Sequence, residues 1–192
     1  MIAIIDYDAG NIRSVEKALQ HLGEETILTH DFREIQKADK VILPGVGAFG
    51  DAMGHLKHYE LDRAIKEVVA MDKPFLGICL GLQLLFEGLG ILKGNILRIP
   101  EEDGLKIPHI GWNSLEFPRV GRLFQDLPAY PYVYFVHSYY LQAQEPQIVT
   151  ATCEYGVQIH ASVEKNQVFA CQFHPEKSGE VGLKILKNFA TL

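Results

Sequence analysis

The feature that most constrains the fold of this chain is the alternation, in its first half, of short apolar runs with longer amphipathic segments. Residues 2–5 and 75–78 are apolar runs of strand length, whereas the segment that starts at Ile12 repeats apolar residues at helical spacing and ends at Gly23. Such alternation is typical of a parallel sheet covered by helices on both faces, which binds ligands at the carboxyl ends of its strands. The expected strands of this half are 2–5, 26–29, 41–43 and 75–78, and the expected helices start at residues 12, 61 and 80.

The second half has a different pattern, in which short strand candidates alternate with turn residues. Lys165-Asn166 is typical of a hairpin tip, and residues 179–190 have the pattern of a closing helix. The whole chain therefore predicts an α/β fold with a doubly wound, mostly parallel sheet and additional antiparallel strands in the C-terminal half. Since no internal repeat or linker is visible, residues 1–192 are expected to form a single domain. The strand candidates of this half are 96–99, 115–117, 132–136, 148–153, 157–164 and 168–172.

Charge and composition argue against several classes of protein. The formal net charge is −6 and no dense Lys/Arg run occurs, so we expect no nucleic-acid partner. The apolar run 2–5 stops at Asp6 without a preceding basic segment, and no run approaches the ~20 residues of a membrane helix, so neither a signal peptide nor a membrane partner is expected. Three cysteines do not make a disulfide framework. A cytoplasmic location, where a thiol stays free for chemistry, is the expectation.

Gly77-Ile78-Cys79-Leu80-Gly81 lies where a predicted buried strand becomes a helix, and it has the form of a nucleophile elbow with cysteine in place of serine. A sharp turn of this kind exposes the nucleophile and crowds the backbone on either side, where glycine has no Cβ to clash. The positive end of the following helix favours a thiolate. A buried structural cysteine is the alternative, and we prefer that interpretation for Cys153 and Cys171.

His174-Pro175-Glu176 follows the last predicted strand. Proline keeps the preceding residue extended, and residues i and i+2 of an extended segment point to the same side. Glu176 can therefore fix the tautomer of His174, which is the arrangement of base and orienting group that thiol activation needs. The tripeptide alone is weak, but together with the elbow cysteine it predicts one active site at the carboxyl ends of the strands.

Residues 45–50 match G-x-G-x-x-G after a strand, which is the pattern of a dinucleotide-binding loop. Pro44 enters this loop, the strand is the third and not the first, and the following helix does not begin strongly apolar. We therefore expect an oxyanion strand, whose glycines let backbone N–H groups turn towards a developing oxyanion. His55 and His58 have no third ligand at fixed spacing, so they are expected on a solvated helix face and not in a metal site.

These motifs together resemble those of the class I, triad-type glutamine amidotransferases and, within that class, the glutaminase subunits of imidazole glycerol phosphate synthase. The resemblance runs from Ile2 to Phe189. The elbow and His-Pro-Glu are general to the class, whereas the Pro-Gly-Val-Gly loop, Ile-Gly-Trp-Asn and His-Pro-Glu-Lys-Ser are more specific to these subunits. The segments that carry the resemblance are 6–11, 43–49, 77–86, 108–113, 134–140 and 172–178.

The resemblance implies a flavodoxin-like fold and a Cys-His-Glu triad. Cys79 is implied to attack the carboxamide of glutamine, while His174 takes and returns protons and Glu176 orients His174. The resemblance further implies that backbone groups of the loop and of the residue after the nucleophile stabilise the oxyanion; these residues are Gly45, Val46, Gly47 and Leu80.

Residues that hold glutamine and meet a partner are implied in the same way. Gln83 lies one helical turn beyond Cys79 on the same face, so it can reach bound L-glutamine. Ser138 and Tyr139 are implied to hold the amino-acid end of the substrate. The residues expected near the partner are Asn11, Trp112, Tyr134 and Lys177.

The implied partner is a (β/α)₈-barrel synthase (cyclase) subunit, which receives the ammonia away from bulk water. It forms imidazole glycerol phosphate and aminoimidazole carboxamide ribotide in histidine biosynthesis. The phosphates bind the barrel, which accounts for the lack of a P-loop motif here, and we expect this chain to need no cofactor and no metal. An oxyanion strand that is misaligned until the synthase substrate binds is a further expectation.

Two positions depart from the family pattern. Asp8 stands where relatives often have glycine or asparagine, and aspartate tolerates a positive φ better than most residues. The stretch 87–90 is shorter than the polar loop that relatives usually carry.

Other functions fit parts of the pattern. A stand-alone thiol hydrolase or protease would use the elbow cysteine on peptides or esters without a partner, whereas a silent binding module would have no reactive thiol. The glutaminase subunit of a different amidotransferase is a further alternative. Ammonia release with and without the barrel subunit, peptide cleavage and alkylation of Cys79 distinguish these functions.

Overall fold

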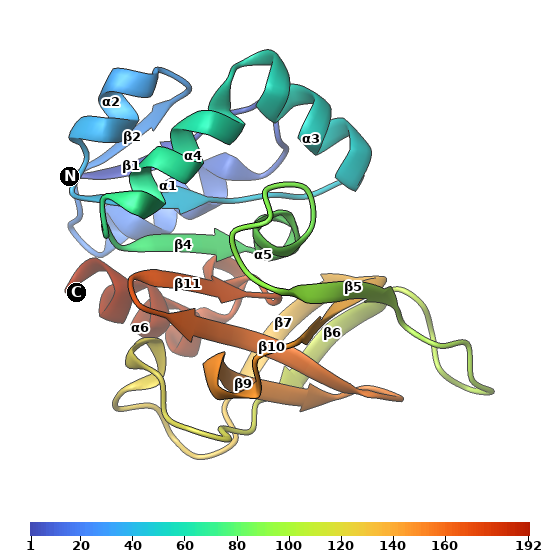
Figure 1. The fold of residues 1–192 in the computed structure, drawn as a ribbon. Coiled ribbons are helices and arrows are strands. Elements are labelled where there is room, and N and C mark those ends of the chain that lie inside the picture. Colours follow the sequence, from blue (N-terminus) through green and yellow to red (C-terminus); the bar gives the residue numbers. More distant parts are fainter.

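The computed structural model describes all 192 residues, and its centre is a seven-stranded sheet (Figure 1). The order across this sheet is β2 (Thr26–Thr29), β1 (Ile2–Ile5), β3 (Lys40–Leu43), β4 (Phe75–Ile78), β11 (Val168–Cys171), β10 (Gln158–Lys165) and β9 (Val149–Glu154). Neighbours from β2 to β11 are parallel, whereas β10 is antiparallel to both of its neighbours. The predicted α/β class, with a mostly parallel sheet and antiparallel strands from the second half, is confirmed.

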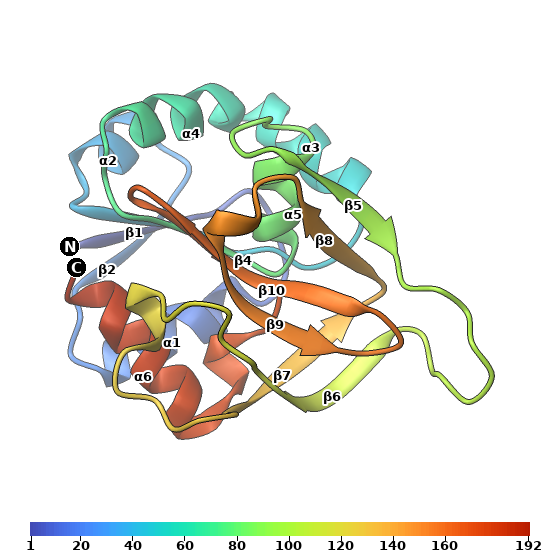
Figure 2. The ribbon, with the colours of Figure 1, turned by 60° about the horizontal axis from the view of Figure 1, so that its bottom comes forward.

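Helices cover both faces of the sheet (Figures 1 and 2). Because side chains of a strand alternate between faces, Ala3 and Ile5 belong to one core cluster and Ile2 and Ile4 to the other. The first cluster includes residues of α2 (Phe32–Lys37), α3 (Phe49–His58), α4 (Leu61–Ala70) and α5 (Leu80–Phe86). The second includes residues of α1 (Ile12–His21) and α6 (Gly179–Ala190). None of these helices has the length and apolar character needed to span a bilayer.

Two antiparallel ribbons extend the C-terminal half of the fold. One pairs β5 (Gly94–Arg98) with β8 (Tyr139–Ala143), and the other pairs β6 (His109–Ser114) with β7 (Tyr132–His137). In the second ribbon the inner face buries His109 and His137, while the outer face exposes Ile110 and Trp112. This ribbon therefore joins a buried polar layer to an apolar surface.

The sequence prediction of a strand at 115–117 is wrong, and β6 ends just before it. Leu115 N–H donates to the Pro131 carbonyl, but Pro131 has no N–H with which to continue the ladder. Only Glu116 forms an isolated bridge, with Thr152 of β9. The segment contributes Leu115 to the core without becoming a strand.

The two departures from the family pattern have clear local structures. Asp8 has a φ of 63°, so it occupies the left-handed conformation, which aspartate tolerates better than most residues. After α5 the chain turns back tightly at Gly88, and the Leu89 N–H donates to the Leu84 carbonyl at 3.1 Å. The Glu87 carboxylate then accepts the Ile96 N–H at 2.9 Å, which fastens this short connection to β5.

Candidate active site

Cys79 lies on the sharp turn between β4 and α5, with φ 54° and ψ −105°. A Cβ on Gly77 would come within 2.9 Å of the Gly81 backbone, and a Cβ on Gly81 would lie 2.0 Å from the Leu43 carbonyl oxygen. Both glycines are therefore required by close backbone approach, as the elbow motif predicted. Holding a residue other than glycine in this conformation costs on the order of 1–3 kcal/mol, which the surrounding packing must offset.

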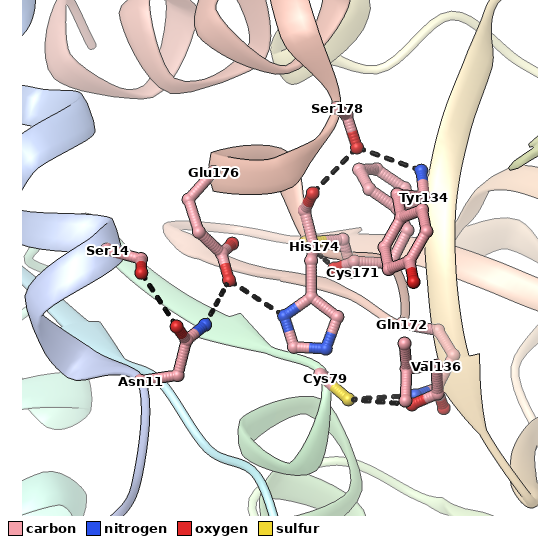
Figure 3. A network of polar contacts seen from close by, with 11 residues as sticks. Asn11, Ser14, Cys79, Tyr134, Val136, Cys171, Gln172, His174, Glu176 and Ser178 are labelled. Carbon is pink, nitrogen blue, oxygen red and sulfur yellow. Dashed lines mark hydrogen bonds and ion pairs between the residues drawn. The ribbon is translucent and has the colours of Figure 1, made fainter. Parts of the chain in front are cut away.

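The register of the sheet brings the distant motifs together. β4 and β11 are parallel neighbours, and Ile78 pairs with Cys171. The next residue, Cys79, donates its N–H to the Cys171 carbonyl at 2.8 Å, and the chain continues from there to His174. Figure 3 shows the imidazole of His174 between the carboxylate of Glu176 and the sulfur of Cys79. Two motifs that are almost a hundred residues apart thus meet at adjacent strand ends.

His174 and Glu176 form a buried pair on a turn of 3₁₀ helix. The distance from His174 Nδ1 to Glu176 Oε1 is 2.8 Å, and the two side chains are 2% and 1% exposed. Asn11 Nδ2 donates to the same carboxylate oxygen at 3.0 Å. Burial lowers the pKa of His174, but hydrogen bonds to Cys79 and Glu176 and the negative charge of both outweigh burial and raise this pKa to about 9. The site favours a protonated imidazole beside the sulfur.

The glycine loop after β3 lies against the elbow. The N–H of Leu80 donates to the carbonyl of Gly45 at 3.3 Å, so a donor implied for the oxyanion is engaged by the loop in this structure. Gly47 has a φ of 101° and no atom within 4 Å of a Cβ built on it. The loop can therefore change its peptide orientation at this position without a side chain that would oppose the change.

A cavity of about 340 Å³ opens over the sulfur. Nine residues singled out from the sequence line it, and Pro108, Val136 and His137 complete the wall. A hollow of about 520 Å³ near Phe117 lies elsewhere and contains no cysteine or histidine. The nine residues are Val46, Gly47, Cys79, Leu80, Gln83, Ser138, Tyr139, His174 and Lys177.

The residues expected near a partner fall into two groups. Asn11 lies against the triad, where it contacts Glu176. Trp112 is 55% exposed on the outer face of the β6–β7 ribbon, and its ring meets that of Tyr134 edge-on with centroids 6.0 Å apart. Lys177 is exposed at the rim of the cavity. The last three share one side of the site, whereas Asn11 is a neighbour of the catalytic pair.

The other cysteines and the surface histidines occupy the places that the sequence indicated. Cys153 and Cys171 are buried free thiols; burial raises the pKa of Cys153 to about 12 and that of Cys171 well above its usual value. His55 and His58 are exposed on α3, and His55 Nδ1 lies 2.9 Å from the Tyr7 carbonyl oxygen.

Several polar residues of the site were not singled out in the sequence. Gln172 is fully buried, and its Nε2 lies 3.6 Å from the Cys79 sulfur. His109 and His137 are buried neighbours, with Nδ1 of the former 3.0 Å from Nε2 of the latter. Gln172 and His137 lie within segments that carry the resemblance, but the sequence assigned them no role, and only the fold shows that their side chains turn towards the site.

Comparisons with known proteins cover the whole chain. Residues 3–192 match the family described as glutamine amidotransferase class-I. The chain is 50% identical over 201 residues to imidazole glycerol phosphate synthase subunit HisH of Thermosynechococcus vestitus, covering 100% of this chain and 96% of that protein. It is 50% identical to the HisH subunit of Moorella thermoacetica, with 100% and 94% covered. A solved structure of PurLQS from Thermotoga maritima has the same fold, with a TM-score of 0.81, 22% identity and coverage of 99% and 97%.

Proposed function

The chain belongs to the class I glutamine amidotransferases, and we propose that residues 1–192 act as a single glutaminase domain that supplies ammonia to an imidazole glycerol phosphate synthase. The observation that carries the chemistry is the buried His174–Glu176 pair beside the sulfur of Cys79. The identity with HisH subunits over the full chain supports the choice of synthase among amidotransferases.

The reaction begins with the transfer of the Cys79 thiol proton to His174, whose positive charge Glu176 stabilises. The sulfur attacks the carboxamide carbon of glutamine, and the electron pair of the C=O bond moves to oxygen. When the oxyanion collapses, the C–N bond breaks and His174 returns the proton to the leaving nitrogen, which departs as ammonia. His174 then takes a proton from water, and the resulting hydroxide attacks the thioester carbon. The C–S bond breaks, glutamate is released, and His174 returns its proton to the departing sulfur, which restores the thiol.

The oxyanion requires two backbone donors, and we assign them to the loop at Val46–Gly47 and to Leu80. In this structure the Leu80 N–H is held by the Gly45 carbonyl. The proposed site is therefore completed when the loop shifts and releases that donor, which is the gating expected for a glutaminase that works only with its partner. The absence of a Cβ at Gly47 makes such a shift sterically open.

In this proposal glutamine occupies the cavity above Cys79, with its amino-acid end against Gln83 and the Ser138–Tyr139 segment. All three residues line that cavity, together with Val46 and Gly47 of the loop that offers an oxyanion donor. Gln83 is oriented by a hydrogen bond from its Nε2 to the Tyr139 carbonyl at 3.2 Å. The substrate carboxamide then lies next to the sulfur.

The barrel synthase subunit docks on the outer face of the β6–β7 ribbon in this proposal. Ile110, Trp112 and Tyr132 are 59%, 55% and 59% exposed there, an apolar patch of the kind that marks a protein interface. Val136, on the same ribbon, lines the cavity, so ammonia released at Cys79 has a short path to this face. The three free thiols fit a cytoplasmic location.

Replacement of the nucleophile tests the function. Cys79→Ala in the complex with the barrel subunit should abolish ammonia release from glutamine, while added ammonia still supports the synthase reaction. Cys153→Ala is the matched control and should retain glutamine-dependent turnover, since its thiol is buried away from the cavity. Full glutamine-dependent activity of Cys79→Ala would refute the proposal.

A further inference from the structure

The sulfur of Cys79 has polar neighbours besides His174 (Figure 3). The Gln172 amide nitrogen lies 3.6 Å away and the Val136 carbonyl oxygen 3.8 Å away. These two groups have opposite preferences: the carbonyl can only accept the thiol proton, whereas an N–H can only donate to the sulfur. Val136 thus favours the neutral thiol, and an N–H of Gln172 would favour the thiolate.

The orientation of the Gln172 amide follows from the Tyr139 carbonyl, which can only accept. Gln83 Nε2 lies 3.2 Å from that oxygen, so the nitrogen of the Gln83 amide must point towards it. The same nitrogen lies 3.1 Å from the Gln172 side chain, which must present its oxygen there. The nitrogen of Gln172 is then left to face the sulfur, and an amide flip would place two donors against each other at Gln83.

Gln172 is also held rigidly. Its side chain is fully buried, and its backbone N–H donates to the Ala161 carbonyl at 2.8 Å directly after β11. A buried amide costs free energy unless it is hydrogen-bonded, and this one satisfies its nitrogen at the sulfur. The donor is therefore in place before substrate arrives, with no side chain to reorganise when charge develops.

We propose that Gln172 is a catalytic residue that donates a hydrogen bond to the Cys79 thiolate. The inference rests on the proposed function, in which Cys79 is the nucleophile. When the thiol proton moves to His174, the charge left on sulfur is shared by the Gln172 N–H on one side and the imidazolium on the other. When the sulfur attacks, the negative charge passes to the substrate oxygen, while the Gln172 amide keeps its position. It can then donate again when hydrolysis of the thioester regenerates the thiolate.

The test measures the rate of iodoacetamide labelling of Cys79 as a function of pH, in the complex with the barrel subunit. Gln172→Met keeps the length and volume of the side chain but removes the donor. A hydrogen bond to a charged group is worth enough to move the labelling midpoint upwards by about one pH unit, which slows labelling roughly tenfold below the midpoint and leaves the high-pH plateau nearly unchanged. Gln142→Met, the same change at an exposed position of β8, should leave the profile where it is. Labelling reports Cys79 because its sulfur lines the cavity, whereas the other two thiols do not and have raised pKa values.

Gln172→Glu is the second variant, since a carboxylate can still accept the Gln83 N–H and fill the same space. It should move the midpoint upwards further than Gln172→Met does, because a negative group replaces a donor. Midpoints equal to that of the wild type in both variants would overturn the role of Gln172. A different outcome would refute the proposed function: the wild-type complex would have a reactive Cys79 but would release no ammonia from glutamine.

Discussion

Two sets of buried histidines lie within one region of this molecule and carry opposite charge preferences. His174 is paired with Glu176 and Cys79, and its pKa is raised to about 9. His109 and His137 are paired with each other, and burial lowers the pKa of both to about 4. For His137, a hydrogen bond to the Tyr139 backbone partly opposes the effect of burial on the pKa, whereas repulsion from the charged forms of His109 and His174 adds to it.

The difference shows that burial lowers the pKa of these histidines, and that the neighbours of His174 reverse this effect. Glu176 accepts the Nδ1 proton of His174 and leaves Nε2 for the sulfur. His137 Nδ1 donates to the Tyr139 carbonyl at 2.8 Å, so its Nε2 must accept from His109 in the neutral form. The first arrangement suits a proton carrier, whereas the second suits a fixed hydrogen-bond chain.

The largest expected effect comes from removing the charge that separates the two sets. Glu176→Gln keeps the shape of the pair but takes away its negative charge, so the pKa of His174 should fall towards the values of the other two histidines. Ammonia release from glutamine should fall by about 10²–10⁴-fold, the range for an orienting acid of a triad. Steady-state assays of the complex measure it.

Glu180→Gln is the matched control, because it makes the same change on the exposed first turn of α6. It should leave the rate of the complex within a factor of about two, as expected for a surface substitution. A Glu176→Gln complex with the wild-type rate and pH profile would mean that the carboxylate is not needed to hold a proton on His174.

The second expected effect is an opposite dependence of stability on pH. The lowered pKa values of His109 and His137 contribute stability that is present above pH 6.5 and lost as pH falls through about 4. The raised pKa of His174 contributes stability that is complete below pH 6.5 and lost as pH rises through about 9. Urea unfolding at pH values from 4 to 9.5 gives the free energy of unfolding as a function of pH. Its decrease towards acid pH is the acid limb, and its decrease towards alkaline pH is the alkaline limb.

Two variants separate the limbs. The double variant His109→Phe, His137→Asn keeps the aromatic stack of His109 and the donor to Tyr139, and should flatten the acid limb only. Glu176→Gln should reduce the loss of stability at alkaline pH without removing it, because Cys79 still raises the pKa of His174, and it should leave the loss at acid pH unchanged. His58→Asn, at an exposed position of α3, should change neither. Loss of the acid limb in Glu176→Gln would contradict the assignment of the two limbs.

Much of the fold could be predicted from the sequence because its signals are local. The apolar run 75–78 and the glycines beside Cys79 predict β4 and the elbow, and residues 179–190 match α6. Neither β6 nor β8 was predicted, because their residues alternate polar, aromatic and glycine positions, and their stability comes from partners in distant segments. Pairing across the chain is not visible in such short patterns.

The site shows the same contrast between residues that local patterns predict and residues that depend on long-range contacts. The triad was predicted because both motifs stand at strand ends, where proline and glycine restrict the backbone. Asn11 was expected near a partner, yet its amide contacts Glu176, which is 165 positions away along the chain. Gln172 and the histidine pair were missed because their roles depend on the β4–β11 register and on the Tyr139 carbonyl, which no local pattern encodes.

The smallest expected effect concerns what the neutral pair does for glutamine. The Tyr139 carbonyl accepts from His137 and from Gln83, and the Ser138–Tyr139 segment lines the cavity. An asparagine at position 137 can place an N–H where Nδ1 was, whereas a glutamine reaches only the position of Nε2. One neutral hydrogen bond is worth about 0.5–1.5 kcal/mol, so His137→Gln should raise the KM for glutamine by roughly two- to tenfold with little change in kcat, and His137→Asn should raise it less. The order of the two KM values matters more than the size of either change. If the imidazole of His137 only filled space, glutamine, which is larger than asparagine, would replace it equally well or better. Equal KM values for His137→Gln and His137→Asn would therefore show that the hydrogen bond to Tyr139 does not support glutamine binding.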